Sequence, residues 1–239
     1  MQTVGDNYAW IYHLVEPSRI NIVCEIGSRD GLDAIAIANH FGCKVYCFEP
    51  DPINYEEVKN NISKSGTIHV VDFNLALGSR NEVVEFHMID PLKYSNRGAS
   101  SLFKLDFSQR GEHDPDFGKS EVTKSIPVQM NRYESLNLSN PDLIAMDVEG
   151  AELEVLNGFG GLLPKVKYIA CEVSILPMHG QGVTFADLRD FLTHHHFRIR
   201  RIEMNYWHFL ICKFFNYRNF VVERLIGNQA NVLFESKNL

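Results

Sequence analysis

The chain has 239 residues and a mass of 27.3 kDa; 45% of its residues are hydrophobic and 22% are charged. This composition is that of a globular protein able to bury a core, and it excludes a disordered or collagen-like chain. The 23 basic and 30 acidic side chains give a formal charge of −7, which argues against a mainly electrostatic grip on nucleic acid. We therefore expect no nucleic-acid partner and a single domain over residues 1–239.

Cysteine use and hydropathy bear on the cellular compartment. The five cysteines form no CxxC pair and no zinc-like spacing with histidine, as is usual in a reducing cytosol. No apolar run approaches the ~18 residues of a membrane span. The first residues also lack the basic-then-apolar order of a signal peptide. We expect a cytoplasmic protein with no membrane partner.

The N-terminal part of the chain alternates between helical and strand patterns. Helical spacing is found at residues 8–15, 32–41 and 52–64, and short apolar runs that predict strands at 20–26, 45–48 and 68–71. Buried strands that alternate with helices are typical of a parallel sheet covered on both faces.

The middle of the chain interrupts this pattern over residues 79–140. Residues 82–89 alternate as a strand does, the polar segment 95–124 predicts a mobile loop, and residues 125–130 are expected to pair with the first of these strands. The alternation then resumes, with strands expected at 142–146, 168–173, 197–202 and 231–235 and helices at 149–157 and 184–196. The predicted fold class is α/β, a mostly parallel doubly wound sheet with a β-hairpin and loop inserted before the fourth core strand.

Ligands of such sheets bind outside the carboxyl ends of the strands, so the residues just after each strand are the candidates for binding. After the second strand, Glu49 and Pro50 place an acid about 20 residues beyond the first loop, where it can accept hydrogen bonds from two ribose hydroxyls. The loop after the first strand admits close approach of a ligand to the backbone, and it consists of Glu25, Ile26, Gly27, Ser28, Arg29, Asp30 and Gly31. Both features predict a cofactor that contains adenosine.

The acids in the first loop decide between cofactors. Ser28 stands where a dinucleotide loop has its second glycine, and Glu25 and Asp30 would repel a pyrophosphate. The same acids suit the ammonium of an amino acid, and Arg29 suits its carboxylate. The pattern favours S-adenosylmethionine over NAD. A nicotinamide-dependent oxidoreductase and a non-catalytic adenosyl-binding protein remain as alternatives.

A second group of polar residues follows the later strands. Asp147 ends a strand and would face the cofactor crevice, with Glu149 close behind it. Asn74 and Ala76 follow the third strand, where they would frame the adenine. His179 lies after a strand end and is a candidate for removing a proton from an acceptor. A divalent metal at Asp147 is not predicted, because spacing alone fixes no second acid ligand.

Four stretches in order resemble the FkbM-type methyltransferases, namely Glu25-Ile-Gly-Ser-Arg-Asp-Gly, Phe48-Glu-Pro-Asp-Pro, Ala76-Leu-Gly-Ser and Asp142-Leu-Ile-Ala-Met-Asp-Val-Glu-Gly-Ala-Glu-Leu-Glu-Val-Leu. The resemblance runs from about residue 23 to residue 172. It implies the Rossmann-like fold of class I methyltransferases, S-adenosylmethionine as cofactor, and methyl transfer to a hydroxyl of a sugar or natural product.

The sequence leaves several methyl acceptors open. We expect O-methylation of a small molecule by Asp147, Glu149 or His179, and a sugar hydroxyl, a phenol and a peptide carboxylate each fit as acceptor. The aromatic-rich segment 206–226 has three interpretations: core packing, a homodimer surface, or part of the acceptor pocket.

Overall fold

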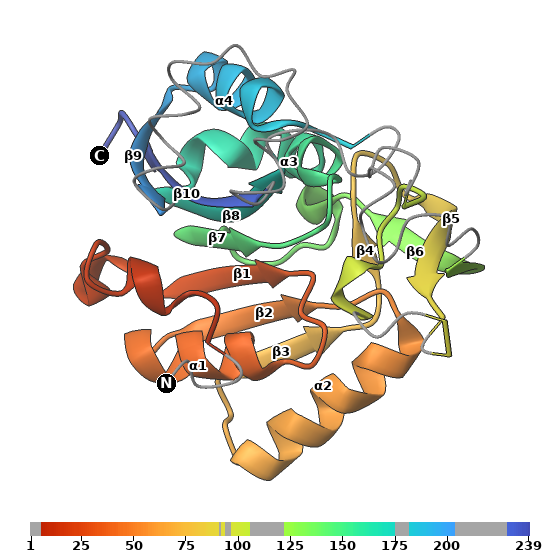
Figure 1. Cartoon of the computed structure of the whole chain (residues 1–239). Coiled ribbons are helices and arrows are strands. Elements are labelled where there is room, and N and C mark those ends of the chain that lie inside the picture. Colours follow the sequence, from red (N-terminus) through yellow and green to blue (C-terminus); the bar gives the residue numbers. More distant parts are fainter. Residues whose placement is uncertain (1–5, 91, 94–96, 106–121, 175–181, 204–228) are drawn as a thin grey trace.

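The computed structural model describes residues 6–90, 92–93, 97–105, 122–174, 182–203 and 229–239 (Figure 1). The strands are β1 (Ile22–Ile26), β2 (Lys44–Phe48), β3 (Val70–Phe73), β4 (Ala76–Leu77), β5 (Glu82–Ile89), β6 (Thr123–Asn131), β7 (Leu143–Met146), β8 (Tyr168–Ser174), β9 (Phe197–Glu203) and β10 (Gln229–Ser236). The helices are α1 (Leu32–Phe41), α2 (Pro52–Ser65), α3 (Glu152–Phe159) and α4 (Phe185–His194), and short 3-10 turns span Ala9–Ile11, Pro17–Arg19, Arg97–Ala99, Tyr133–Ser135 and Gly160–Lys165.

The larger sheet has the strand order β3-β2-β1-β7-β8-β10-β9. Neighbouring strands from β3 to β8 run parallel, whereas β10 enters between β8 and β9 and runs antiparallel to both. The strand order changes direction between β1 and β7, and ligands of doubly wound sheets bind at such a point. The predicted α/β fold with a mostly parallel sheet is confirmed.

Helices cover both faces of this sheet, as Figure 1 shows for α1 and α2 on one side and α3 and α4 on the other. Alternate strand residues therefore enter two separate cores. One core joins Ile144 and Cys171 to the apolar sides of α3 and α4. The other joins Val23 and Ala145 to α1 and to the N-terminal segment. Because both faces are buried, the strands are continuous apolar runs, as the sequence indicated.

A smaller sheet of order β4-β6-β5 stands beside the carboxyl edge of the larger one (Figure 1). Its strands β5 and β6 are antiparallel, in register from Glu82 opposite Met130 to Ile89 opposite Thr123. The predicted pairing of residues 82–89 with 125–130 is thus confirmed. Between these strands, Ser101 is tied to the loop that follows β7, because its hydroxyl donates to the carbonyl oxygen of Glu149 over 2.9 Å.

Helix starts follow the local sequence. The Asp51 carboxylate caps α2 by accepting from the backbone amide of Ile53 over 2.8 Å, and Pro52 occupies the first turn. Thr184 and Asp187 form a capping box at the start of α4.

Two predicted helices differ from the structure. The helix expected over residues 8–15 is only a 3-10 turn at Ala9–Ile11, because Asn7 bonds to the distant Asp33 instead of capping a local turn. The helix expected from Glu149 begins at Glu152, because Glu149 and Gly150 adopt positive φ values of 52° and 95°. Most of the predicted loop 95–124 and the whole segment 206–226 lie outside the described residues.

Candidate active site

Two strand-end loops touch at the switch point of the sheet. A Cβ added at Gly27 would lie 1.9 Å from the backbone carbonyl oxygen of Asp147, and the φ of Gly27 is +84°. The Asp147 amide in turn donates to the Ile26 carbonyl over 3.0 Å. Only glycine combines that space with that φ. The loops after β1 and β7 therefore form one continuous wall.

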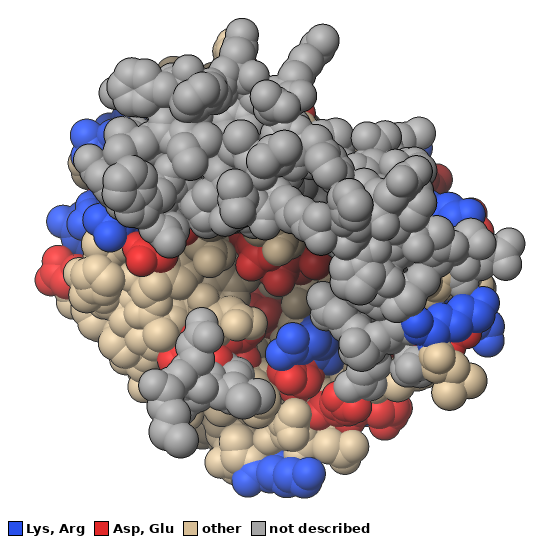
Figure 2. Space-filling model, viewed as in Figure 1, with Lys and Arg blue, Asp and Glu red and all other residues tan. Residues whose placement is uncertain are grey.

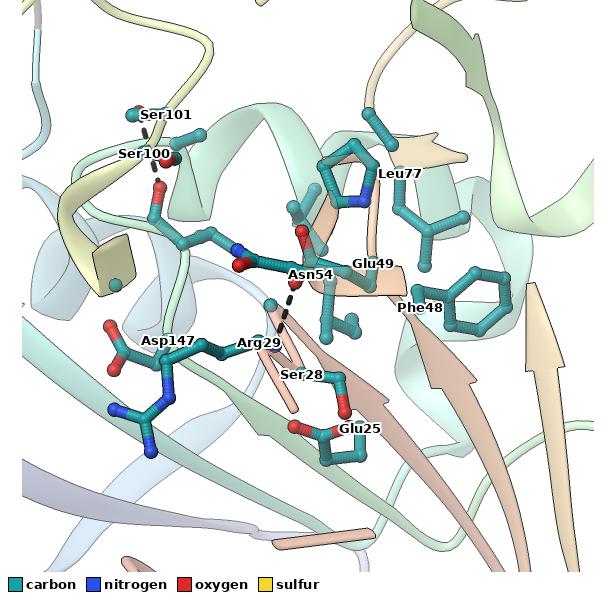
Figure 3. Close-up of a pocket in the computed structure, with 18 of the residues that line it drawn as sticks. Glu25, Ser28, Arg29, Phe48, Glu49, Asn54, Leu77, Ser100, Ser101 and Asp147 are labelled. Carbon is teal, nitrogen blue, oxygen red and sulfur yellow. Dashed lines mark hydrogen bonds between the residues drawn. The ribbon is translucent and has the colours of Figure 1, made fainter. Parts of the chain in front are cut away.

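A pocket opens along this wall, and Figure 2 shows acidic side chains gathered in the hollow at the centre of that face. In Figure 3, Phe48, Glu49 and Leu77 lie toward one end and Asp147, Ser100 and Ser101 toward the other. Its lining comes from the N-terminal segment, the strand ends and the inserted chain, and comprises Asn7, Tyr8, Glu25, Ile26, Gly27, Ser28, Arg29, Asp33, Phe48, Glu49, Pro50, Asn54, Leu75, Ala76, Leu77, Phe86, Gly98, Ser100, Ser101, Leu102, Asp147, Val148, Ala151, Val155, Glu172 and Asn231.

The Glu49 carboxylate is held rigidly at one end of this pocket. Its Oε2 accepts from the backbone amide of Arg29 over 2.7 Å (Figure 3), and its Oε1 accepts from the amide of Asp51 over 2.8 Å. A carboxylate has about four acceptor positions, and the side chain of Asn54 also bonds to this group, so one position stays open for a ligand. Burial raises the pKa of Glu49 to about 7 even though these backbone hydrogen bonds lower it.

The Glu25 carboxylate lies beneath the first loop and is only 1% exposed. Its Oε2 is buried with no hydrogen-bond partner in the described part of the chain. Burial raises the pKa of Glu25 well above its usual range, although hydrogen bonds with Ser28 and Cys47 oppose that shift. A buried oxygen without a donor favours a ligand that brings N–H or O–H groups.

The opposite end of the pocket contains the carboxyl groups of Asp147 and Glu172. Burial raises the pKa of Asp147 well above its usual range, and the carboxylates of Glu149 and Glu172 raise it further. Burial also raises the pKa of Glu172. A carboxyl group with a raised pKa is a stronger base once it is ionised, which suits proton removal.

Comparison with known proteins identifies the family. The family model described as the Methyltransferase FkbM domain matches residues 25–199, which is most of the chain. The chain belongs to the FkbM methyltransferase family. The resemblance expected from the sequence is thus confirmed, and the domain is of the S-adenosylmethionine-dependent type.

Two curated relatives are similar to this FkbM domain. The 2-O-methyltransferase NoeI of Sinorhizobium fredii is 27% identical over 64% of this chain and 63% of its own length. The hexuronic acid methyltransferase AglP of Haloferax volcanii is 24% identical over 67% of this chain and 59% of its own length. The chain therefore spans about three fifths of each of these relatives.

A solved structure has the same fold. The methyltransferase FkbM from Methylobacillus flagellatus KT superposes with a TM-score of 0.53 at 13% identity, over 90% of this chain and 44% of that one. At that identity the likeness supports the fold alone, and it agrees with the doubly wound sheet described above.

Most sequence-predicted cofactor residues of the FkbM domain meet in the pocket, and these are Glu25, Gly27, Ser28, Arg29, Glu49, Pro50, Ala76 and Asp147. Asp30, Gly31 and Asn74 are absent from its lining. Asp30 accepts from the Leu32 amide at the start of α1. The Asn74 amide holds the loop after β2 by donating to the carbonyl of Glu49 over 2.9 Å.

The predicted catalytic residues are placed differently from one another. Asp147 lines the pocket, whereas Glu149 sits in the strained turn behind it and does not line it. His179 lies outside the described residues. In the described ranges, no three His, Cys, Asp or Glu side chains are grouped as metal ligands would be, and no helix there combines the length and apolar character of a membrane span.

Several lining residues have no local sequence signal. Asn7 reaches the pocket because its backbone and side-chain nitrogens donate to Asp33 over 2.6 and 2.9 Å. Ser100 and Ser101 come from the insertion, and Asn231 comes from the antiparallel strand β10. Their places depend on pairings between distant segments, which periodicity does not reveal.

Proposed function

We propose that this chain is an S-adenosylmethionine-dependent O-methyltransferase that acts on a hydroxyl of a small molecule, such as a sugar or natural product. The observation that carries the proposal is the continuous pocket from Glu49 past Gly27 to Asp147. It joins a site for a nucleoside to a carboxyl group able to take a proton. The names of the two curated relatives, a 2-O-methyltransferase and a hexuronic acid methyltransferase, support an acceptor of the sugar class.

The pocket fits the cofactor in three places. Glu49 offers its remaining acceptor position to the ribose hydroxyls, and Leu75, Ala76 and Leu77 provide an apolar wall for the adenine. The ammonium group of the cofactor would donate a hydrogen bond to the unpartnered Oε2 of Glu25. Because Gly27 has no side chain, the loops after β1 and β7 approach each other closely and together line the pocket between these ends.

Methyl transfer requires mainly that the protein align the acceptor hydroxyl with the cofactor and remove its proton. When bound, the cofactor supplies a methyl group already activated by its sulfonium. Asp147 orients the acceptor hydroxyl and takes its proton as the new C–O bond forms, for which its raised pKa suits it. Ser101 holds the loop that carries Asp147 by bonding to the carbonyls of Val148 and Glu149.

The alternatives from the sequence make different demands on the pocket. A nicotinamide dinucleotide would bring a pyrophosphate to the first loop, where Glu25 and Asp33 lie buried and Arg29, the one cation of the described lining, already pairs with Asp30. Repulsion by these acids disfavours the oxidoreductase. A non-catalytic adenosyl-binding protein would have no use for a basic carboxyl group at the far end of the pocket.

Titration calorimetry with S-adenosylhomocysteine and with NAD tests the cofactor, and labelled-methyl transfer to candidate acceptors tests the reaction. We expect S-adenosylhomocysteine to bind and NAD not to bind. Binding of NAD alone would overturn the proposal. Binding of S-adenosylhomocysteine without any methyl transfer across a broad acceptor screen would favour the non-catalytic alternative.

A further inference from the structure

Three polar side chains form a row across neighbouring strands at the carboxyl edge of the larger sheet. The parallel pair β7 and β8 is in register through Met146 opposite Cys171, so the next residues, Asp147 and Glu172, stand side by side. In the antiparallel pair, Asn231 on β10 lies directly opposite Glu172. Opposed residues of a ladder project to the same face, and all three line the pocket.

The side chains of this row have no hydrogen-bond partner among the described residues. No group in the described chain donates a hydrogen bond to the carboxyl group of Asp147 or Glu172, and the side-chain amide of Asn231 has no hydrogen bond there either. Glu25, on the same face of the sheet and 1% exposed, also has an oxygen without a partner in the same pocket. Glu25 Oε2 is a buried oxygen of the kind that native proteins rarely leave unpaired, and Asp147, Glu172 and Asn231 are half-buried, so this face of the sheet offers acceptors to a ligand rich in donors.

The charges nearby restrict the kind of ligand. Among the described lining residues the one cation is Arg29, and its guanidinium pairs with Asp30 at 3.3 Å. A carboxylate or phosphate next to Asp147 would face Glu172 and Asp33 with no further cation from the described lining to neutralise it. A hydroxyl group, by contrast, donates readily to an ionised carboxylate.

We infer that Asp147, Glu172 and Asn231 form an acceptor subsite that selects two neighbouring hydroxyls of an uncharged polyol and rejects an acidic group at the reacting position. The first hydroxyl donates to Asp147 and is methylated, and the second donates to Glu172. The amide of Asn231 offers a donor and an acceptor to the same part of the acceptor. This inference rests on the proposed function. It favours a neutral acceptor over an acidic one such as the hexuronic acid in the name of the second curated relative.

The test follows labelled methyl transfer by the full chain to 4-nitrophenyl glycosides of neutral sugars and to the matching uronides. A methyl ether survives mild alkali and a methyl ester does not, so alkali distinguishes a methylated hydroxyl from a methylated carboxylate. We expect alkali-stable label on neutral glycosides, with uronides slower by about tenfold or more.

Variants then test Glu172 itself. Glu172→Gln should raise the KM for neutral glycosides about tenfold, with a smaller rise for deoxy acceptors that lack the neighbouring hydroxyl. The same variant should reduce the difference in transfer rate between neutral glycosides and uronides. The affinity for S-adenosylhomocysteine should not change. Glu85→Gln, which removes an exposed carboxylate on β5, is the matched control and should change neither constant. Asn231→Ala tests the same row if Glu172→Gln does not fold.

Three outcomes would overturn the inference while S-adenosylhomocysteine still binds. They are alkali-labile label on uronides as the main product, an unchanged KM in both variants, and no transfer to any glycoside of the panel. Failure of S-adenosylhomocysteine to bind the unmodified chain would instead contradict the proposed function.

Discussion

The carbonyl oxygen of Asp147 occupies the place where any residue other than glycine at position 27 would carry its Cβ, at a distance of 1.9 Å. One backbone contact thus ties the cofactor loop to the residue proposed as the base. We expect a change in either loop to alter the distance between the proposed nucleoside and acceptor sites. The spacing of the two proposed half-sites is set by packing of backbone and not by flexible side chains.

Gly27→Ala should separate these loops. The clash and the positive φ of +84° should lower the unfolding free energy by about 3 kcal/mol, and S-adenosylhomocysteine binding should be lost. Urea denaturation and calorimetry measure the two effects. Gly161→Ala is the control, because a Cβ there meets nothing within 4 Å, and it should stay within about 0.5 kcal/mol of the parent. Equal behaviour of the two variants would contradict the close approach.

Asp147→Asn should abolish the base while keeping the size of the side chain. We expect kcat for methyl transfer to fall about 100-fold or more, with little change in S-adenosylhomocysteine affinity. Steady-state kinetics with labelled cofactor measures the fall. Asp190→Asn, an exposed aspartate on α4, is the matched control. A kcat close to that of the parent would show that another group takes the proton.

The stability of the ligand-free chain should fall as pH rises from about 5 to 8. Burial raises the pKa of both Glu49 and Glu152 from 4.5 to about 7 in the folded state. Between those values the folded chain keeps protons that the unfolded chain has released, so the unfolding free energy decreases with pH. Urea titrations at several pH values measure this slope. A stability that rises over the same range would contradict the burial of these groups.

The N-terminal segment should contribute to cofactor binding through Asn7. Asn7→Ala removes the side-chain donor to Asp33 and leaves the backbone donor in place. We expect S-adenosylhomocysteine affinity to fall several-fold, in line with about 1 kcal/mol for one hydrogen bond. Asn157→Ala removes a comparable bond on α3, to the Leu153 carbonyl, and should leave affinity unchanged. Calorimetry that shows equal affinities for the two variants would place the segment outside the site.

The sequence predicted those parts of the fold that depend on local pattern. The apolar runs of β1, β2, β7 and β8 and the loops that follow them could be found because burial on both faces leaves a continuous hydrophobic signal. Glu49 and Gly27 were predictable for the same reason, since each directly follows such a run. The O-methyl acceptor, the single domain, the homodimer and the mobile loop at residues 95–124 remain predictions.

Features that depend on distant contacts were missed or misplaced. The helix predicted at 8–15 is only a 3-10 turn, and Asp33, 26 residues from Asn7, binds both nitrogens of that residue. The strand at 231–235 was predicted, but not its entry between two earlier strands, which alone brings Asn231 to Glu172. A helix was predicted over residues 149–157, whereas the structure puts Glu149 in a turn with a positive φ of 52°.

The antiparallel strand β10 also constrains the order in which the sheet is assembled. Within the larger sheet β9 pairs with β10, and β10 pairs with β8 about sixty residues earlier in the chain. During synthesis, residues 22–174 can form the parallel part of the sheet while β9 still has no place in it. Only when residues 229–236 emerge can the last two strands join, and contacts of such sequence separation form slowly. The proposed acceptor subsite, which needs Asn231, would therefore be completed last.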